Sequence, residues 1–342
     1  MADFPVRLAH SPDSDDMVMW WPLVGLDGRT PAIDIAPFCF ELVARDVEEL
    51  NKLVVGEAAA SPALQARTDI RASVSADASR AGSARPYDVT AISCAAYPAI
   101  RERYVVSRCG GSFGEGYGPR VVARESRNRK MGSGNREDER DARATDVDSL
   151  RGARIAVPGV NTTAFLTLSL MLGSTRTKPA FEPVEMLFSE IPAAVALGEV
   201  DAGLLIHEAQ LTFAELGLVE VANLGRWWGT QTDLPLPLGL NVVRRDLDAR
   251  HGAGTVKRLG EVLSASVRHA VAHPAECRAH LQRHKGSRTE WDDPGLVDRY
   301  LAMYVSALTV DMGDRGRLAI EHLLARGYEA GLCAKPGMIE VV

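Results

Sequence analysis

The sequence predicts an α/β protein built from two similar lobes that enclose a ligand cleft. Three observations support this fold class. Short β-like runs alternate with helical segments along most of the chain, one strand-and-helix unit occurs twice, and the chain beyond residue 254 has a helical pattern almost to its end. Alternation of this kind is typical of a mostly parallel sheet with helices on its faces.

The expected strands are short runs rich in Val, Ile and Leu and bounded by Gly, Pro or Asp. They cover residues 6–10, 33–43, 88–93, 104–109, 120–124, 153–158, 201–207, 218–224 and 236–245. The expected helices cover residues 16–25, 46–54, 161–173, 190–198, 255–272, 274–285, 294–309 and 314–328. Two stretches are expected to be solvated insertions, since the first has few large apolar groups and the second is densely charged: 57–85 and 125–147.

The repeated unit places similar residues at similar points in the two halves. VRLAHSPDSDDM (6–17) and ARIAVPGVNTTAF (153–165) each run from a strand through a proline into a polar helix start. Two later strands each begin with Asp and end with a polar residue, Ser93 in the first half and His207 in the second. Because strand carboxyl ends and helix N-termini line the crevice of open α/β sheets, Ser93 and His207 are expected to face one cleft.

Composition excludes several functional classes. The 342 residues, 46% apolar and 25% charged, are typical of a globular protein and sufficient for two domains. A net charge of −6 argues against nucleic acid as a partner, and no apolar run is long enough to span a membrane. Five cysteines without a CxxC motif, together with an N-terminus unlike a signal peptide, predict a cytoplasmic protein with reduced thiols. The oligomeric state stays open, a homodimer included.

One polar helix start is a candidate binding site for a carboxylate or phosphate. Asn161, Thr162 and Thr163 offer hydroxyl or amide groups and backbone N–H groups where the helix dipole is positive. N-capping of the helix by Asn161 or Thr162 is the competing interpretation.

The other polar helix start contains Ser11 and three carboxylates, Asp13, Asp15 and Asp16. Carboxylates stabilise a helix N-terminus but repel an anionic ligand. Ser11 and main-chain amides are therefore the better candidates for ligand binding here.

His207 is the candidate general base. It ends a buried apolar strand in the segment LLIHE, beside Glu208. At such an edge the imidazole would be partly desolvated and neutral at pH 7, as a general base must be. A hydrogen-bonded core histidine is the competing interpretation.

Other motifs are interpreted as structural. Ser112 lies in a G-x-S-x-G pattern, but the glycine-rich residues after it cannot form the helix that a nucleophile elbow needs. Cys94 and the Trp227–Trp228 pair are expected to pack in the interior. No nucleotide-binding motif is present, and no cofactor is expected.

Two histidine pairs have the i, i+4 spacing that metal sites use, namely His269/His273 and His280/His284. The sequence shows no third ligand near either pair, and Pro274 interrupts the helical pattern. Solvent-facing helix positions are therefore expected for these histidines, and no metal site is expected.

Motifs along most of the chain resemble those of the 1,4-dihydroxy-6-naphthoate synthase family, which acts in the futalosine route to menaquinone. The N-terminal motif reads SPDSDD where other members have SPCPND. The matching segments are AHSPDSDD (9–16), DVEELN (46–51), AISCAAYPAIRERY (91–104), GGSFGEGYGP (110–119), RIAVPGVNTTAFLTLSL (154–170), GEVDAGLLIHE (198–208), LGRWWGTQTDLPLPLG (224–239) and VRHAVAHP (267–274).

The resemblance implies a fold like that of type 2 periplasmic binding proteins, with two α/β lobes closing over a cleft. It implies a carbon–carbon lyase that fragments a small-molecule carboxylate, cyclic dehypoxanthine futalosine, into 1,4-dihydroxy-6-naphthoate and dihydroxyacetone. By motif, His207 matches the proton acceptor of the family. The matching substrate-binding positions are Ala91, Ile92, Ser93, Thr163, Ala164 and Asn51.

Lobe boundaries are expected at RVVAR (120–124) and LPLGLNVV (236–243), the strands predicted to cross between lobes. Residues 1–121 and 240–342 would then form lobe 1, and residues 122–239 lobe 2. Two alternative functions stay open. One is chorismate dehydratase, an enzyme of the same route with a related fold, and the other is a non-catalytic solute-binding protein of this architecture.

Overall fold

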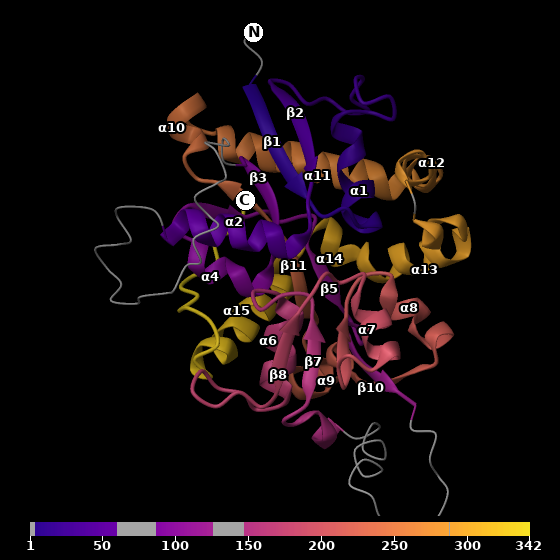
Figure 1. Cartoon of the computed structure of the whole chain (residues 1–342). Coiled ribbons are helices and arrows are strands. Elements are labelled where there is room, and N and C mark those ends of the chain that lie inside the picture. Colours follow the sequence, from indigo (N-terminus) through magenta and orange to yellow (C-terminus); the bar gives the residue numbers. More distant parts are fainter. Residues whose placement is uncertain (1–3, 60–86, 126–146, 287) are drawn as a thin grey trace, which may run out of the picture.

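The chain forms two β-sheets with helices packed around them (Figure 1). The computed structural model describes residues 4–59, 87–125, 147–286 and 288–342. Most of the two predicted insertions, 57–85 and 125–147, lies outside the described residues. Where the first insertion is described, residues 57–59 continue a helix.

The two sheets have the same strand order when β1, β2 and β3 are matched with β7, β8 and β9, and β11 and β4 with β6 and β10. The first sheet has the order β2-β1-β3-β11-β4, and β5 pairs with β11 beside this path; the second has the order β8-β7-β9-β6-β10. The first sheet consists of β1 (Phe4–His10), β2 (Phe38–Ala44), β3 (Val89–Ser93), β4 (Tyr104–Val106), β5 (Ser112–Gly114) and β11 (Leu236–Arg244). The second sheet consists of β6 (Arg120–Arg124), β7 (Arg154–Val157), β8 (Glu182–Glu185), β9 (Ala202–Leu205) and β10 (Leu218–Asn223).

The structure confirms the internal repeat down to single hydrogen bonds. Asp88, just before β3, accepts a hydrogen bond from the backbone N–H of Arg7 at 2.9 Å, and Asp201, just before β9, accepts one from Arg154 at 2.8 Å. In each sheet the Asp side chain thus fixes a parallel strand against its neighbour. The strands that follow these aspartates end near Ser93 and His207.

The expected mostly parallel sheet is corrected to two mixed sheets. β1 is parallel to β2 and β3, and β7 is parallel to β8 and β9. However, β11 is antiparallel to β3, and β6 is antiparallel to β9. β6 is the first strand of the second sheet along the chain and β11 is the last strand of the first sheet, and each runs opposite to the parallel strands of its sheet. The lobe boundaries stay a prediction.

Most predicted elements are present with shifted ends, while β5 and β8 were not predicted. β5 has three residues and β8 carries a proline and two glutamates, so neither shows an apolar run. The α-helices in the described part of the chain are α1 (Ser14–Trp20), α2 (Val47–Ala59), α4 (Tyr97–Ile100), α6 (Thr163–Met171), α7 (Ile191–Leu197), α8 (Ala209–Thr212), α9 (Leu224–Thr232), α10 (Leu247–His251), α11 (Thr255–Ala272), α12 (Pro274–His284), α13 (Pro294–Tyr304), α14 (Ala307–Val310) and α15 (Gly313–Glu329).

The C-terminal helices hold the N-terminal helix in place. α11 buries Leu259, Val262, Leu263 and Val267, whose spacing gives it one apolar face toward the first sheet. α1, which begins at the end of β1, packs against α11, α12 and α13. α15 instead contacts both β11 and α6, and so joins elements of the two sheets. Within the described part of the chain, none of the helices combines the length with the apolar character that crossing a membrane requires.

Candidate active site

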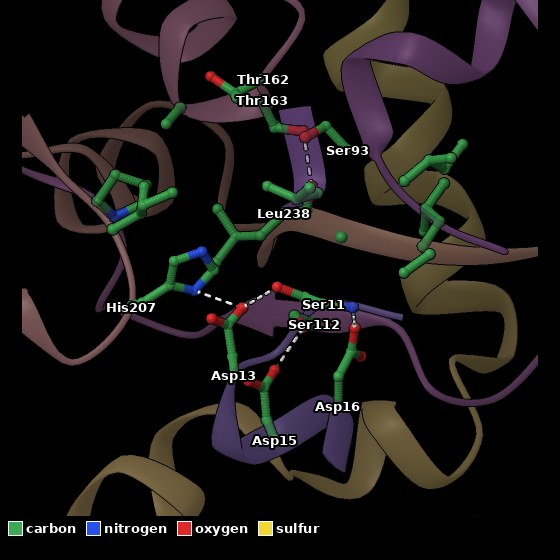
Figure 2. A pocket seen from close by; sticks show the side chains of 18 of the residues that line it. Ser11, Asp13, Asp15, Asp16, Ser93, Ser112, Thr162, Thr163, His207 and Leu238 are labelled. Atoms are coloured by element: carbon green, nitrogen blue, oxygen red, sulfur yellow. Dashed lines mark hydrogen bonds and ion pairs between the residues drawn. The ribbon is translucent and has the colours of Figure 1, made fainter. Parts of the chain in front are cut away.

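A cavity lies between the two sheets, at the ends of β1, β3 and β9 (Figure 2). Its volume is about 690 Å³ with the part open to solvent included. Of the predicted site residues, those that line the cavity are Ser11, Ala91, Ile92, Ser93, Thr162, Thr163, Ala164 and His207.

Asn51 is the predicted site residue that does not line the cavity. It is fully buried in α2, where its Oδ1 accepts a hydrogen bond from the backbone N–H of Ser93 at 2.8 Å. Its Nδ2 donates to the hydroxyl of Ser93 at 3.0 Å. Asn51 therefore lies behind Ser93 and outside the cavity lining, and its direct contact with a ligand stays a prediction.

His207 meets Asp13 across the cavity. The imidazole Nδ1 lies 2.8 Å from Oδ2 of Asp13, which comes from the other sheet's loop after β1 (Figure 2). Asp13 is also held by the hydroxyl of Ser11, which donates to the same oxygen at 2.5 Å. Asp13 precedes the first residue of α1, but its side chain makes no capping hydrogen bond. It faces the histidine instead.

The backbone at His207 has a left-handed conformation, with φ of 55°, which is uncommon for a residue other than glycine. The ring packs edge-to-face against Phe188 with centroids 4.8 Å apart, and the hydroxyl of Tyr300 lies 3.5 Å from Nδ1. Strained backbone conformations of this kind concentrate at functional sites. Contacts on several sides fix the imidazole in one orientation.

The surroundings of His207 contradict the expected neutral imidazole. Burial lowers the pKa of His207, but the charge and hydrogen bond of Asp13 outweigh burial, and the pKa rises to about 9. His207 therefore carries a proton at pH 7 and forms an ion pair with Asp13. The sequence could not show this effect, because Asp13 and His207 are far apart along the chain.

The pKa values of three other carboxyl groups near His207 are also raised. Burial, followed by the charge of Asp13, raises the pKa of Asp15 to about 7. Burial and the charge of Asp15 raise the pKa of Asp16 well above its usual range, and burial raises that of Glu208. The aspartates were predicted to be poorer ligand candidates than Ser11, yet all three line the cavity. Partial protonation lets such groups donate hydrogen bonds as well as accept them.

The polar helix start at 161–163 forms part of the opposite wall. Thr162 caps α6 by accepting a hydrogen bond from the backbone N–H of Phe165 at 3.1 Å, so the capping interpretation is confirmed for Thr162. The hydroxyl of Thr163 donates to the carbonyl of Leu238 at 2.6 Å and accepts from the N–H of Ala95 at 3.2 Å. These bonds tie α6 to elements of the first sheet.

Further hydrogen bonds join elements of the two sheets beside the cavity. Nδ2 of Asn161 donates to Glu48 at 2.7 Å, and the hydroxyl of Ser14 donates to Glu208 at 2.9 Å. Glu48 approaches so closely to Gly159 that a Cβ there would lie 2.3 Å from its side chain. The described conformation is thus closed around the cavity.

Asn241 is a lining residue that the sequence did not reveal. Its side chain is buried on β11, and its Nδ2 donates to the carbonyl of Gly110 at 2.8 Å. That bond fixes the orientation of the amide, and Oδ1 has no hydrogen-bond partner among the described residues. Buried acceptors are nearly always paired, so this oxygen is suited to a donor on a ligand. An isolated Asn within an apolar strand gives no sequence signal for this position.

The motifs set aside by sequence have mixed outcomes. Cys94 and Trp228 are buried as expected, and burial raises the pKa of the Cys94 thiol. Ser112 lies in β5 rather than on a nucleophile elbow, yet it lines the cavity, and its hydroxyl donates to Asp15 at 3.3 Å. The solvent-facing expectation was wrong for His280, which is 7% exposed because it faces the core beneath Trp21.

Known proteins resemble the chain over most of its length. A family model described as menaquinone biosynthesis matches residues 61–329. The 1,4-dihydroxy-6-naphthoate synthase of Thermus thermophilus is 34% identical over 329 residues, which is 96% of both chains. The chain belongs to this enzyme family. The synthase of Streptomyces coelicolor is 36% identical over 72% of this chain and 77% of its own.

Solved structures resemble the chain in fold. Protein AF1704 from Archaeoglobus fulgidus has 33% sequence identity and a TM-score of 0.69, with 96% of this chain and 98% of that chain covered. The alkanesulfonate-binding protein SsuA from Xanthomonas axonopodis has 16% identity and a TM-score of 0.59, with 99% and 97% covered. The second likeness shows the fold alone, which is like that of periplasmic binding proteins, as the sequence predicted.

Proposed function

We propose that this member of the 1,4-dihydroxy-6-naphthoate synthase family cleaves a carbon–carbon bond in cyclic dehypoxanthine futalosine. The products would be 1,4-dihydroxy-6-naphthoate and dihydroxyacetone, with His207 as the proton acceptor. The observation that carries the proposal is the contact between His207 and Asp13 in the wall of a cavity that Ser93, Thr162 and Thr163 also line. A cytoplasmic location is part of the same proposal, because the relatives are named as biosynthetic enzymes.

The expected reaction needs a base to accept a proton, but it needs no external source of free energy. Loss of the three-carbon sugar remnant makes the second ring of the product aromatic, and this offsets the broken bond. His207 would accept a proton from the substrate as the bond breaks, a step that typically contributes about 10²–10⁴-fold to the rate. Asp13 would then stabilise the imidazolium ion, since it already lies 2.8 Å from Nδ1.

The raised pKa of His207 has a consequence for this step. With a pKa of about 9, only about one molecule in a hundred carries a neutral imidazole at pH 7. The neutral form is a stronger base for the same reason, because proton affinity and pKa rise together. Activity should therefore increase as the pH rises toward 9.

The remaining lining residues would bind the substrate. The N-terminal end of α6, at Thr162 and Thr163, favours a negative group such as the carboxylate of the substrate. Ser93, held by Asn51, would donate to an oxygen of the ring system, and Oδ1 of Asn241 would accept from a hydroxyl. Closure of the two sheets around the ligand would exclude bulk water.

Incubating the purified protein with cyclic dehypoxanthine futalosine tests the proposal. We expect the fluorescence and mass of 1,4-dihydroxy-6-naphthoate to appear, and no turnover of chorismate as the control substrate. Turnover of chorismate alone would identify a dehydratase, and binding without turnover of either compound would identify a solute-binding protein.

The variant His207→Asn tests the role of the base separately. It should bind the substrate almost as the wild type does, with turnover reduced by about 10²–10⁴-fold. Near-normal turnover by this variant would eliminate His207 as the proton acceptor, whatever the substrate proves to be.

A further inference from the structure

We propose that Glu208 is a positioning residue that fixes His207 in the closed conformation. Its Oε1 accepts hydrogen bonds from the hydroxyl of Ser14 at 2.9 Å and from the indole N–H of Trp291 at 3.2 Å. Glu208 is not among the described residues that line the cavity. It therefore acts through His207, and this role rests on the proposed function of His207 as the base.

The contacts across the two sheets are in register at this point. Nδ1 of His207 lies 2.8 Å from Oδ2 of Asp13, and the next residue, Glu208, contacts Ser14, the residue after Asp13. Two neighbours that follow β9 thus meet two neighbours that follow β1. Because Glu208 directly follows His207, contacts that fix the side chain of Glu208 also restrict the backbone at His207.

Trp291 is a rigidly held donor. It lies in a 3₁₀ helix (Thr289–Asp292) before α13, and its side chain is 1% exposed. The indole packs in an apolar cluster that includes Val18 of α1 and Cys277 and Leu281 of α12. The N–H is therefore fixed by the helices that pack around α1, and it points to a residue of the other sheet's side.

The side chain of Glu208 makes these contacts instead of capping its own helix. Glu208 occupies the N-cap position of α8, but its side chain forms no capping hydrogen bond. Asp13 does the same at the start of α1. Two carboxyl groups at helix starts, one on each side of the cavity, thus bind groups of the opposite side.

His207 needs such support because of its backbone conformation. Its φ is 55°, in the left-handed region that residues other than glycine seldom occupy. Conformations of this kind persist only where the surrounding structure fixes them. Without the hydrogen bonds of Glu208, the backbone could relax to a commoner conformation and carry the imidazole away from Asp13.

Steady-state kinetics of three variants tests the role. Glu208→Leu should lower kcat at least about tenfold and change KM less than about threefold, because the base is displaced while the cavity lining is kept. Glu208→Gln keeps an acceptor oxygen and should retain most of the activity. Trp291→Phe keeps an aromatic ring in the cluster but loses the donor, so it should also lower kcat.

A matched control is Trp21→Phe. Trp21 belongs to the same apolar cluster, and its indole N–H donates to Cys277 of α12 at 3.4 Å, within the same group of helices. This variant also loses an indole hydrogen bond, but the lost bond does not reach the second sheet. Its kcat should stay close to that of the wild type.

Combination with His207→Asn separates positioning from a merely structural effect. A residue that acts through His207 has no further effect once the imidazole is gone, so Glu208→Leu should not lower the residual turnover of His207→Asn. Near-normal turnover by His207→Asn alone would contradict the proposed base. If His207→Asn is impaired and Glu208→Leu is as active as the wild type, only the positioning role fails.

Nuclear magnetic resonance tests the hydrogen bond without any reaction. The chain has five tryptophans, and Trp291→Phe identifies the indole signal of Trp291 by its loss. Glu208→Leu should move this indole proton to lower frequency, because the proton loses its acceptor. The indole signal of Trp21 is the internal control and should stay in place.

Three further results would overturn the proposal. They are an unmoved Trp291 signal in Glu208→Leu, a loss of kcat in Glu208→Gln equal to that in Glu208→Leu, and a further fall in turnover when Glu208→Leu is added to His207→Asn. Urea denaturation shows whether each variant folds. If Glu208→Leu does not fold, kcat of Trp291→Phe against that of Trp21→Phe decides the question.

Discussion

Nδ1 of His207 lies 2.8 Å from Oδ2 of Asp13, although the two residues follow strands of different sheets. The contact links the sheets across the cavity and raises the pKa of the imidazole to about 9. One interaction therefore couples the closed conformation to the strength of the proposed base.

Asp13→Asn should move the pH dependence of the reaction. Without the negative charge, burial dominates and the pKa of His207 falls, so the rising limb of kcat/KM should shift to lower pH by at least about one unit. The plateau should drop at least about tenfold, because the imidazolium loses its partner. Rate profiles from pH 5.5 to 10 measure both effects. Asp34→Asn, at an exposed carboxylate, is the control. An unshifted limb in Asp13→Asn would contradict the coupling.

The same ion pair should make stability depend on pH. The pKa of His207 is raised in the folded chain, so its stabilising contribution is complete below about pH 6.5 and is lost as the pH rises through about 9. The shift corresponds to about 3 kcal/mol of unfolding free energy. Urea denaturation at pH 6 and pH 9.5 measures the loss, which should be much smaller in His207→Asn. Equal losses in both proteins would show that other groups cause it.

Asn51→Leu should destabilise the protein more than Ser93→Ala does. Leucine leaves the buried N–H of Ser93 without the acceptor that Asn51 provides, at a cost of about 1–3 kcal/mol. Ser93→Ala keeps this backbone hydrogen bond and loses only the hydroxyl. Urea denaturation measures the difference, and KM should rise in both variants. If the two variants unfold alike, Asn51 does not position the strand end.

Asn241→Leu should weaken substrate binding with little effect on folding. The variant loses one hydrogen bond to Gly110 but also removes a buried acceptor that has no partner in the described residues. The missing acceptor should cost about 1–3 kcal/mol with substrate bound, or roughly 5- to 150-fold in kcat/KM. Ser112→Ala, on the same cavity wall, is the comparison. An unchanged kcat/KM in Asn241→Leu would place this oxygen outside the substrate site.

Gly159→Ala should oppose closure. A methyl group there would lie 2.3 Å from the side chain of Glu48, which belongs to the other sheet's helix α2. Overpacking of this size should raise KM roughly tenfold or more and increase the radius of gyration measured by small-angle scattering. Gly173→Ala is the matched control, since it also has a positive φ but nothing within 4 Å of a new Cβ. Equal effects in both variants would attribute them to backbone strain alone.

The repeated unit in the sequence was enough to predict two similar sheets and to bring Ser93, Thr162, Thr163 and His207 to one cavity. Strand ends and helix starts are local features, and their positions in an α/β sheet follow general rules. The mixed direction of the strands was not predictable in this way, because it depends on how the chain enters and leaves each sheet.

By itself, therefore, the sequence determined the fold class, the family and eight of the residues that line the cavity. Only the tertiary structure decided that Asp13 raises the pKa of His207, that Asn51 lies behind Ser93, and that Asn241 lines the cavity. The physical reason is that pKa values and hydrogen bonding depend on burial and on neighbours distant in the chain. Asp13 illustrates this point, because the sequence suggests a helix-start carboxylate and the fold places it against His207.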